Sequence, residues 1–218
     1  MIGERIPIKI LAVRLIANAS EPLCRSLGLT GQHRTLGLIS ADCDDATYLA
    51  LDEACKSANV EVVYARSLYA GASNASTSLA GEVIGVLGGK TPSEVSAALR
   101  VAVNSLKTLG FRTANEDGSI VYLAHCVSSS GSFLSKTAKV PLGQPLAYLI
   151  APPVEAVVGL DQALKAADVE LAAFYAPPTE TNFAGGLLCG TESACQAACQ
   201  AFAEAVRAVA AAPKGEFE

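Results

Sequence analysis

Two stretches of this chain carry apolar side chains at helical spacing. Apolar positions three or four residues apart fall on one face of an α-helix, and that face packs against a core. The pattern predicts amphipathic helices over residues 92–106 and 192–211. Their apolar stripes are Val95, Leu99, Ala102 and Leu106 in the first helix, and Cys195, Cys199, Phe202 and Val206 in the second.

Short apolar runs rich in Val, Ile and Leu alternate with these helices and predict β-strands. The runs are 8–17, 36–40, 60–65 and 83–87, then 119–127, 147–150, 169–174 and 186–189. A helix of about 14 residues is expected after 36–40 and after 147–150. Asp42, Asp44 or Asp45 is predicted to cap the first of these two helices. The second is predicted to begin at the Pro152-Pro153 pair, because proline suits the first helical turn.

The same order of elements occurs twice, with an offset of about 109 residues. Residues 51–62 read LDEACKSANVEV and residues 160–171 read LDQALKAADVEL, which are identical at seven of twelve positions. A repeat of this length indicates a domain duplication, with domains over 1–110 and 111–218. Residues 80–95 also match 184–196, an alignment that sets Gly186 opposite Glu82. The expected fold class is α+β: two tandem domains, each an antiparallel sheet flanked by helices.

Composition and charge exclude two kinds of partner. Half of the residues are apolar, but no uninterrupted apolar run reaches the roughly 18 to 20 residues that span a bilayer. The apolar stretch 6–19 contains Lys9 and Arg14, which argues against a signal peptide. The formal net charge is −5 and lysine and arginine do not cluster, so nucleic acid is not an expected partner. We therefore expect no membrane and no nucleic-acid partner.

The residues that support catalysis or metal binding do not form a recognisable set. The seven cysteines are scattered through both repeats without a C-x-x-C pair, which suits reduced thiols that fill a core. His125 and Cys126 are adjacent and would point to opposite faces of a strand, so they form a poor metal pair. The motifs G-x-S-x-G and H-E-x-x-H are absent. We expect no enzyme activity, no catalytic residue, no metal and no cofactor.

One long loop follows the third predicted strand in each repeat. Residues 65–82 and 175–186 are rich in Gly, Ala, Ser, Thr or Pro. Loops of this length inside a compact domain are often functional or mobile, although an ordinary hairpin connection remains an alternative.

Several longer motifs, in order, resemble a known family. The runs are TLGLISADCDDATY, EVVYARSLYAGA, AGEV, APPVE and PPTETNFAG. They are similar to the bacterial microcompartment shell domain, in the permuted form that occurs twice per chain in the tandem-domain trimer class, and within it to the ethanolamine-utilisation shell proteins. The resemblance implies a cytoplasmic shell protein that forms a homotrimer, packs beside neighbouring shell proteins, and has a gated central pore and small substrate pores. A duplicated α+β sensor of small molecules, without shell assembly, is the alternative.

The resemblance also assigns residues. For ethanolamine or a similar small amine in the small pore, it implies Asp44, Asp45, Glu82, Phe111, Thr181 and Ala184; Asp45 is included as the neighbour of Asp44. For the central-pore loops it implies Tyr69, Gly71, Asn74, Gly81, Pro178, Thr181, Asn182 and Phe183. For the tile edge it implies Lys56 and Lys165. Taken by themselves, the aspartates could equally be solvated residues that cap a helix, and the lysines ordinary exposed helix residues.

Overall fold

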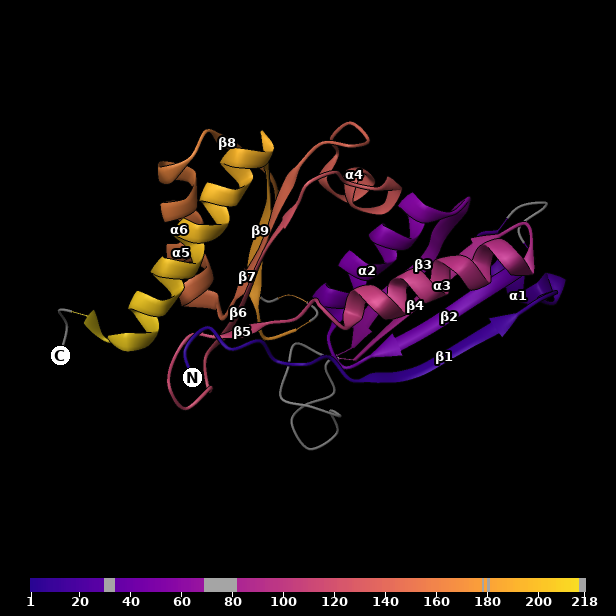
Figure 1. Cartoon of the computed structure of the whole chain (residues 1–218), viewed down its shortest axis with the longest axis horizontal. Coiled ribbons are helices and arrows are strands. Elements are labelled where there is room, and N and C mark those ends of the chain that lie inside the picture. The colour runs from indigo at the N-terminus through magenta and orange to yellow at the C-terminus, as the bar shows by residue number, and fades with distance from the viewer. Residues whose placement is uncertain (30–33, 69–81, 178, 180, 216–218) are drawn as a thin grey trace. The chain divides into compact units, whose positions relative to one another are not determined.

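The computed structural model describes residues 1–29, 34–68, 82–177, 179 and 181–215 (Figure 1). The chain divides into two compact units. The first unit comprises residues 7–109 together with 131–134, and the second comprises 1–6, 110–130 and 135–218. The sequence repeat predicts two domains that meet at residue 110, and these limits stay a prediction. Two short segments pack with the other repeat. Residues 1–6 of the first repeat belong to the second unit, and residues 131–134 of the second repeat belong to the first unit.

The first unit is an antiparallel four-stranded sheet with two long helices on it. The strands are β1 (Ile10–Ile16), β2 (Thr35–Ala41), β3 (Val60–Leu68) and β4 (Glu82–Gly89), in the order β1-β2-β4-β3. The helices are α1 (Glu21–Ser26), α2 (Asp44–Ser57) and α3 (Pro92–Leu106). The helices α2 and α3 pack against each other and against the sheet (Figure 1).

The second unit repeats this plan and adds one short strand. Its strands are β5 (Arg112–Thr113), β6 (Val121–Val127), β7 (Leu146–Ala151), β8 (Val169–Tyr175) and β9 (Ala184–Gly190), in the order β5-β6-β7-β9-β8. Its helices are α5 (Pro153–Ala166) and α6 (Glu192–Ala211), together with most of α4 (Ser132–Ala138). The backbone of residues 3–6 joins the edge at β5, where Gly3 N–H donates to the Thr113 carbonyl at 2.8 Å. The predicted α+β class with antiparallel sheets is confirmed.

Both predicted amphipathic helices are confirmed at their full length. Threonine precedes each of them, and the Thr91 and Thr191 side chains accept backbone N–H groups of the first turn. The predicted stripes are buried, with Cys199 partly so. Sequence patterning missed α1, α4 and β5, because helices of one or two turns and a two-residue strand carry too few positions to show a period.

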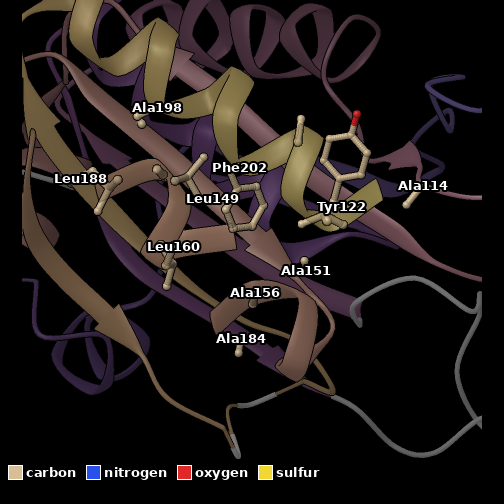
Figure 2. Close-up of a cluster of buried hydrophobic side chains, with 14 of the residues drawn as sticks. Ala114, Tyr122, Leu149, Ala151, Ala156, Leu160, Ala184, Leu188, Ala198 and Phe202 are labelled. Atoms are coloured by element: carbon tan, nitrogen blue, oxygen red, sulfur yellow. The ribbon is translucent and has the colours of Figure 1, made fainter. Parts of the chain in front are cut away.

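Close helix packing defines the core of the second unit. Figure 2 shows Phe202 of α6 beside Leu149 of β7 and close to Leu160 of α5. A Cβ atom on Gly159 would lie 2.6 Å from the Phe202 ring, so α5 can approach α6 only because this position is glycine. Small residues are buried in the same cluster, among them Ala156 of α5, Ala198 of α6 and Ala151 of β7.

The strand ladders fix how the two repeats correspond. The β3–β4 pair has a bulge between Val62 and Tyr64, and the β8–β9 pair has one between Leu171 and Ala173, 109 positions later. Beyond the bulges, Gly85 pairs with Ala65 and Gly186 pairs with Phe174. Gly186 is therefore the counterpart of Gly85.

The sequence alignment that set Gly186 opposite Glu82 is wrong by three positions. Glycine-rich strands offer few side chains to fix a register, whereas backbone hydrogen bonds define it residue by residue.

Among the described helices, none has the length and apolar character needed to cross a bilayer.

Candidate ligand site and assembly surfaces

Three aspartates gather where α2 begins, in the first unit. Asp42, Asp44 and Asp45 are all buried, between 2% and 7% exposed. Asp42 Oδ1 accepts the Lys9 N–H at 2.9 Å, and Asp44 Oδ1 accepts the Asp45 N–H at 2.9 Å. Carboxylates are favoured at this end of a helix because the backbone dipole is positive there.

The prediction that one of these aspartates caps α2 as a solvated charge is wrong. Cys43 occupies the N-cap position and makes no side-chain capping bond, and the aspartates are shielded from solvent. Burial, with the charges of Asp45 and Asp44 adding to it, raises the pKa of the Cys43 thiol well above its ordinary value. The site is thus a buried acidic group around a neutral thiol.

The third predicted acid, Glu82, begins β4. Its backbone pairs with Leu68 at the end of the β3–β4 ladder. The structure describes the backbone of Glu82 and not its side chain. The ladder does establish that Glu82 and its strand follow directly on the first long loop.

The other three predicted ligand residues lie close together in the second unit. The Phe111 ring is fully buried and lies 5.3 Å from the Phe183 ring, centroid to centroid. Ala184 follows Phe183 directly and is buried at the start of β9. These contacts place Phe111, Thr181 and Ala184 in one part of the second unit. Their role in binding a ligand stays a prediction.

Threonine side chains fix the short segment before β9. The Thr179 hydroxyl lies 2.9 Å from the Phe183 carbonyl and 3.1 Å from the Thr181 carbonyl, and it accepts the Thr181 N–H at 3.2 Å. The Phe183 N–H donates to the Thr181 hydroxyl at 3.3 Å. Asn182 is exposed between them. The backbone groups of Thr181 and Phe183 are therefore held by hydrogen bonds, next to the Phe183 side chain that contacts Phe111.

Part of the predicted central-pore set lies outside the described residues. These positions are Tyr69, Gly71, Asn74, Gly81 and Pro178. Thr181, Asn182 and Phe183 are the members of the set that the structure describes.

The two predicted edge lysines occupy matching positions in the last turns of α2 and α5. Lys56 pairs with Glu53, and Lys165 Nζ lies 2.6 Å from Asp161 Oδ2. Both ion pairs are at least partly exposed, so each contributes little to stability.

Sequence reasoning missed the role of Asp52. This residue is 1% exposed, and its two carboxylate oxygens accept the Gly131 N–H at 2.6 Å and the Leu134 N–H at 2.8 Å. The signal was present, since an aspartate recurs at this place in both repeats. Its partner segment, 131–134, could not be found from a local pattern.

Six of the seven thiols have raised pKa values, and the Cys43 thiol has been described above. Burial raises the pKa of Cys195 to about 11, and it also raises the pKa of Cys199, Cys55, Cys126 and Cys189. Thiols with raised pKa values stay protonated and unreactive at neutral pH. In the described part of the chain, no group of three or more His, Cys, Asp or Glu side chains is arranged to hold a metal.

The comparisons with known proteins agree with this geometry. A model of the BMC domain matches residues 35–115. The bacterial microcompartment shell protein EutL of Clostridium perfringens is 58% identical over 216 residues, which cover 99% of this chain and 100% of that protein. This chain belongs to the EutL family of bacterial microcompartment shell proteins. The family consists of structural shell components, so this member of it is a shell protein and not an enzyme.

Solved structures of the EutL family share the fold over the whole chain. A crystal structure of EutL from Clostridium perfringens has a TM-score of 0.95 and covers 100% of this chain and 99% of that one. The ethanolamine utilization protein EutL of Leptotrichia buccalis is 58% identical, with a TM-score of 0.93, over 98% of this chain and 99% of that one. The trimeric bacterial microcompartment shell protein PduB is 22% identical, with a TM-score of 0.75, over 94% of this chain and 90% of that one, and this likeness shows the fold alone.

Proposed function

We propose that three copies of this chain form a pseudohexagonal tile of an ethanolamine-utilisation microcompartment shell. Two similar units per chain suit such a tile, because three chains then present six related units around one axis. The observation that carries the proposal is identity of 58% with EutL over nearly the whole chain.

The tile has a gated central pore formed by the two long loops, with Tyr69, Gly71, Asn74, Gly81, Pro178, Thr181, Asn182 and Phe183. It also has small pores that pass ethanolamine or a similar small amine. At neutral pH ethanolamine is an ammonium with a hydroxyl group. It therefore needs a carboxylate for one end and hydrogen-bonding backbone groups for the other.

The proposed ligand residues supply both kinds of group. Asp44, Asp45 and Glu82 provide the carboxylates. Phe111, Thr181 and Ala184 provide apolar surface and backbone groups.

Light scattering and electron microscopy test the tile. We expect the mass of three chains at micromolar concentration, and flat sheets at higher concentration. Replacing both Lys56 and Lys165 by Glu should leave the trimer folded and abolish the sheets. The control replaces Lys107 and Lys136 by Glu. These lysines are exposed, one in each repeat, and are not proposed edge residues. Sheets formed equally by both double variants would refute the edge assignment, and a monomeric wild-type protein would refute the tile.

Calorimetry with ethanolamine tests the ligand site. A transport site must release its ligand, so we expect a dissociation constant on the order of micromolar to millimolar. Glu82→Gln keeps the shape and removes the charge, which should weaken binding by about 1.5–3 kcal/mol. Glu61→Gln, at an exposed position on β3, is the matched control. Equal affinity of the Glu82 variant and wild type would exclude Glu82, and no binding to wild type would exclude ethanolamine as the ligand.

A further inference from the structure

One face of α2 is covered by residues 131–134, while the matching face of α5 is bare. On α2, Leu49 is 2% exposed, and Asp52, which contacts this segment, is 1% exposed. Their counterparts 109 positions later are Val158, which is 38% exposed, and Asp161, whose side chain is 53% exposed. Val154, Val157 and Leu164 add further exposed apolar area to α5, at 65%, 49% and 37%. An apolar patch of this kind on a helix usually has a partner.

The contacts that cover α2 are specific. Asp52 accepts the Gly131 and Leu134 N–H groups, the Tyr48 ring lies 5.9 Å from the Phe133 ring, and Leu134 is buried to 1%. These covering residues come from the second repeat and belong to the first compact unit. One repeat therefore already provides a segment that binds the helix of the other.

The ladders identify the equivalent segment in the first repeat. Ile16 pairs with Leu36 in the first sheet, and Val127 pairs with Leu146 in the second. The short helix that follows begins at Glu21 in one repeat and at Ser132 in the other. Residues 20–23 are thus the counterpart of 131–134. Unlike Leu134, which is 1% exposed, Leu23 is 40% exposed, so this segment presents an apolar residue to solvent.

We propose that residues 20–23 of one chain dock on the α5 face of a second copy, repeating the contact that 131–134 makes with α2. Leu23 packs against the valines of α5, and Asp161 turns from Lys165 to accept N–H groups of the docked segment. Each chain offers one segment and one face, so the interface is head-to-tail, and in the proposed trimer three such contacts close a ring. This assignment rests on the proposed trimer and names the surfaces that build it.

The two pairs of surfaces differ in compensating ways. Where α2 presents Tyr48 to Phe133, α5 presents Val157 to Pro22, so a pair of rings is replaced by two smaller apolar groups. Gly131 lies so close to α2 that a Cβ would come within 2.7 Å of the Asp52 carbonyl. Ser20 has a Cβ at the equivalent position, so the docked segment sits slightly farther from α5 and its hydroxyl adds a donor for Asp161.

Mixing two variants tests the assignment. Val157→Glu disables the α5 face and Leu23→Glu disables the segment, and both positions are exposed, so circular dichroism should match wild type. We expect each variant alone to be monomeric by light scattering. A one-to-one mixture should form dimers, because the intact segment of one variant meets the intact face of the other, while the remaining pair of surfaces sets two glutamates against each other.

A matched control is Gln162→Glu, which places the same charge on the same helix. Its counterpart in α2 is Glu53, whose side chain stays 43% exposed, so this variant should remain trimeric. A trimeric wild type together with a trimeric Val157→Glu or Leu23→Glu would overturn the assignment and leave the tile standing. A mixture that stays monomeric would also overturn it. A monomeric wild type would remove the tile and the assignment together.

Discussion

The helices α2 and α5 occupy matching positions in the two repeats but have different contacts. Both have 14 residues, begin directly after a central strand and carry an aspartate and a lysine four positions apart. Asp52 is buried and binds two backbone N–H groups, whereas Asp161 is exposed and pairs with Lys165. A similar local sequence therefore gives a buried carboxylate in one repeat and a surface ion pair in the other, because what packs on each helix differs.

The largest difference is expected from deleting the two carboxylates. Asp52→Ala leaves two buried N–H groups without an acceptor and should lower the free energy of unfolding by about 2–4 kcal/mol. Asp161→Ala removes an exposed ion pair and should change it by less than about 0.5 kcal/mol. Urea denaturation of both variants in a Leu23→Glu background, where assembly is already blocked, measures the two effects on the same species. Equal losses in the free energy of unfolding would show that the two aspartates contribute equally to stability, against this prediction.

A smaller effect is expected at the two segments that match each other. Gly131→Ala places a methyl group within 2.7 Å of the Asp52 carbonyl and within 2.8 Å of its carboxylate, so the segment must shift. We expect a loss of about 1–3 kcal/mol in thermal or urea denaturation. The exposed counterpart, Ser20→Gly, should cost only a few tenths of a kcal/mol in the same assay. Tolerance of alanine at position 131 would contradict the tight contact.

The smallest effect concerns pH. Burial raises the pKa of the Asp52 carboxyl above its ordinary value, against the lowering effect of its hydrogen bonds with Leu134 and Gly131. A group with a raised pKa in the folded state binds its proton more tightly there. The stabilisation that comes from this tighter proton binding is therefore complete below the unfolded pKa and is lost as pH rises through the folded pKa.

Stability measured from pH 4 to pH 7 should accordingly include a decline that Asp52→Asn removes. Urea midpoints of wild type and variant over this range provide the measurement. If the two curves run parallel, Asp52 does not titrate with a raised pKa.

Periodic features were predictable from the sequence, and short ones were not. The stripes of 92–106 and 192–211 gave α3 and α6 at their full extent, since a helix of four or more turns repeats its pattern several times. The short helix α4 was missed, yet its first residues supply the partner of Asp52. That partner lies about 80 positions away in the chain, beyond the reach of any local pattern.

The candidate ligand site shows the same division. The resemblance to shell proteins named Phe111, Thr181 and Ala184, and the contact between Phe111 and Phe183 brings these three together. Asp44 and Asp45 were also named, but their burial was not foreseen, because charged residues at a helix start are usually solvated. The predicted alignment of Glu82 with Gly186 was wrong, since glycine-rich strands can be aligned in several registers, and the ladders make Gly85 the counterpart of Gly186.

By itself, the sequence determined the duplication, the α+β class and the family, because these follow from periodicity and from long motifs in a fixed order. Only the tertiary structure decided which aspartate is buried, which helix face is covered and how the two strand ladders correspond. The physical reason is that burial and register depend on what packs against a residue. Two helices at matching places in the repeats can therefore differ in exposure when a distant segment contacts one of them and not the other.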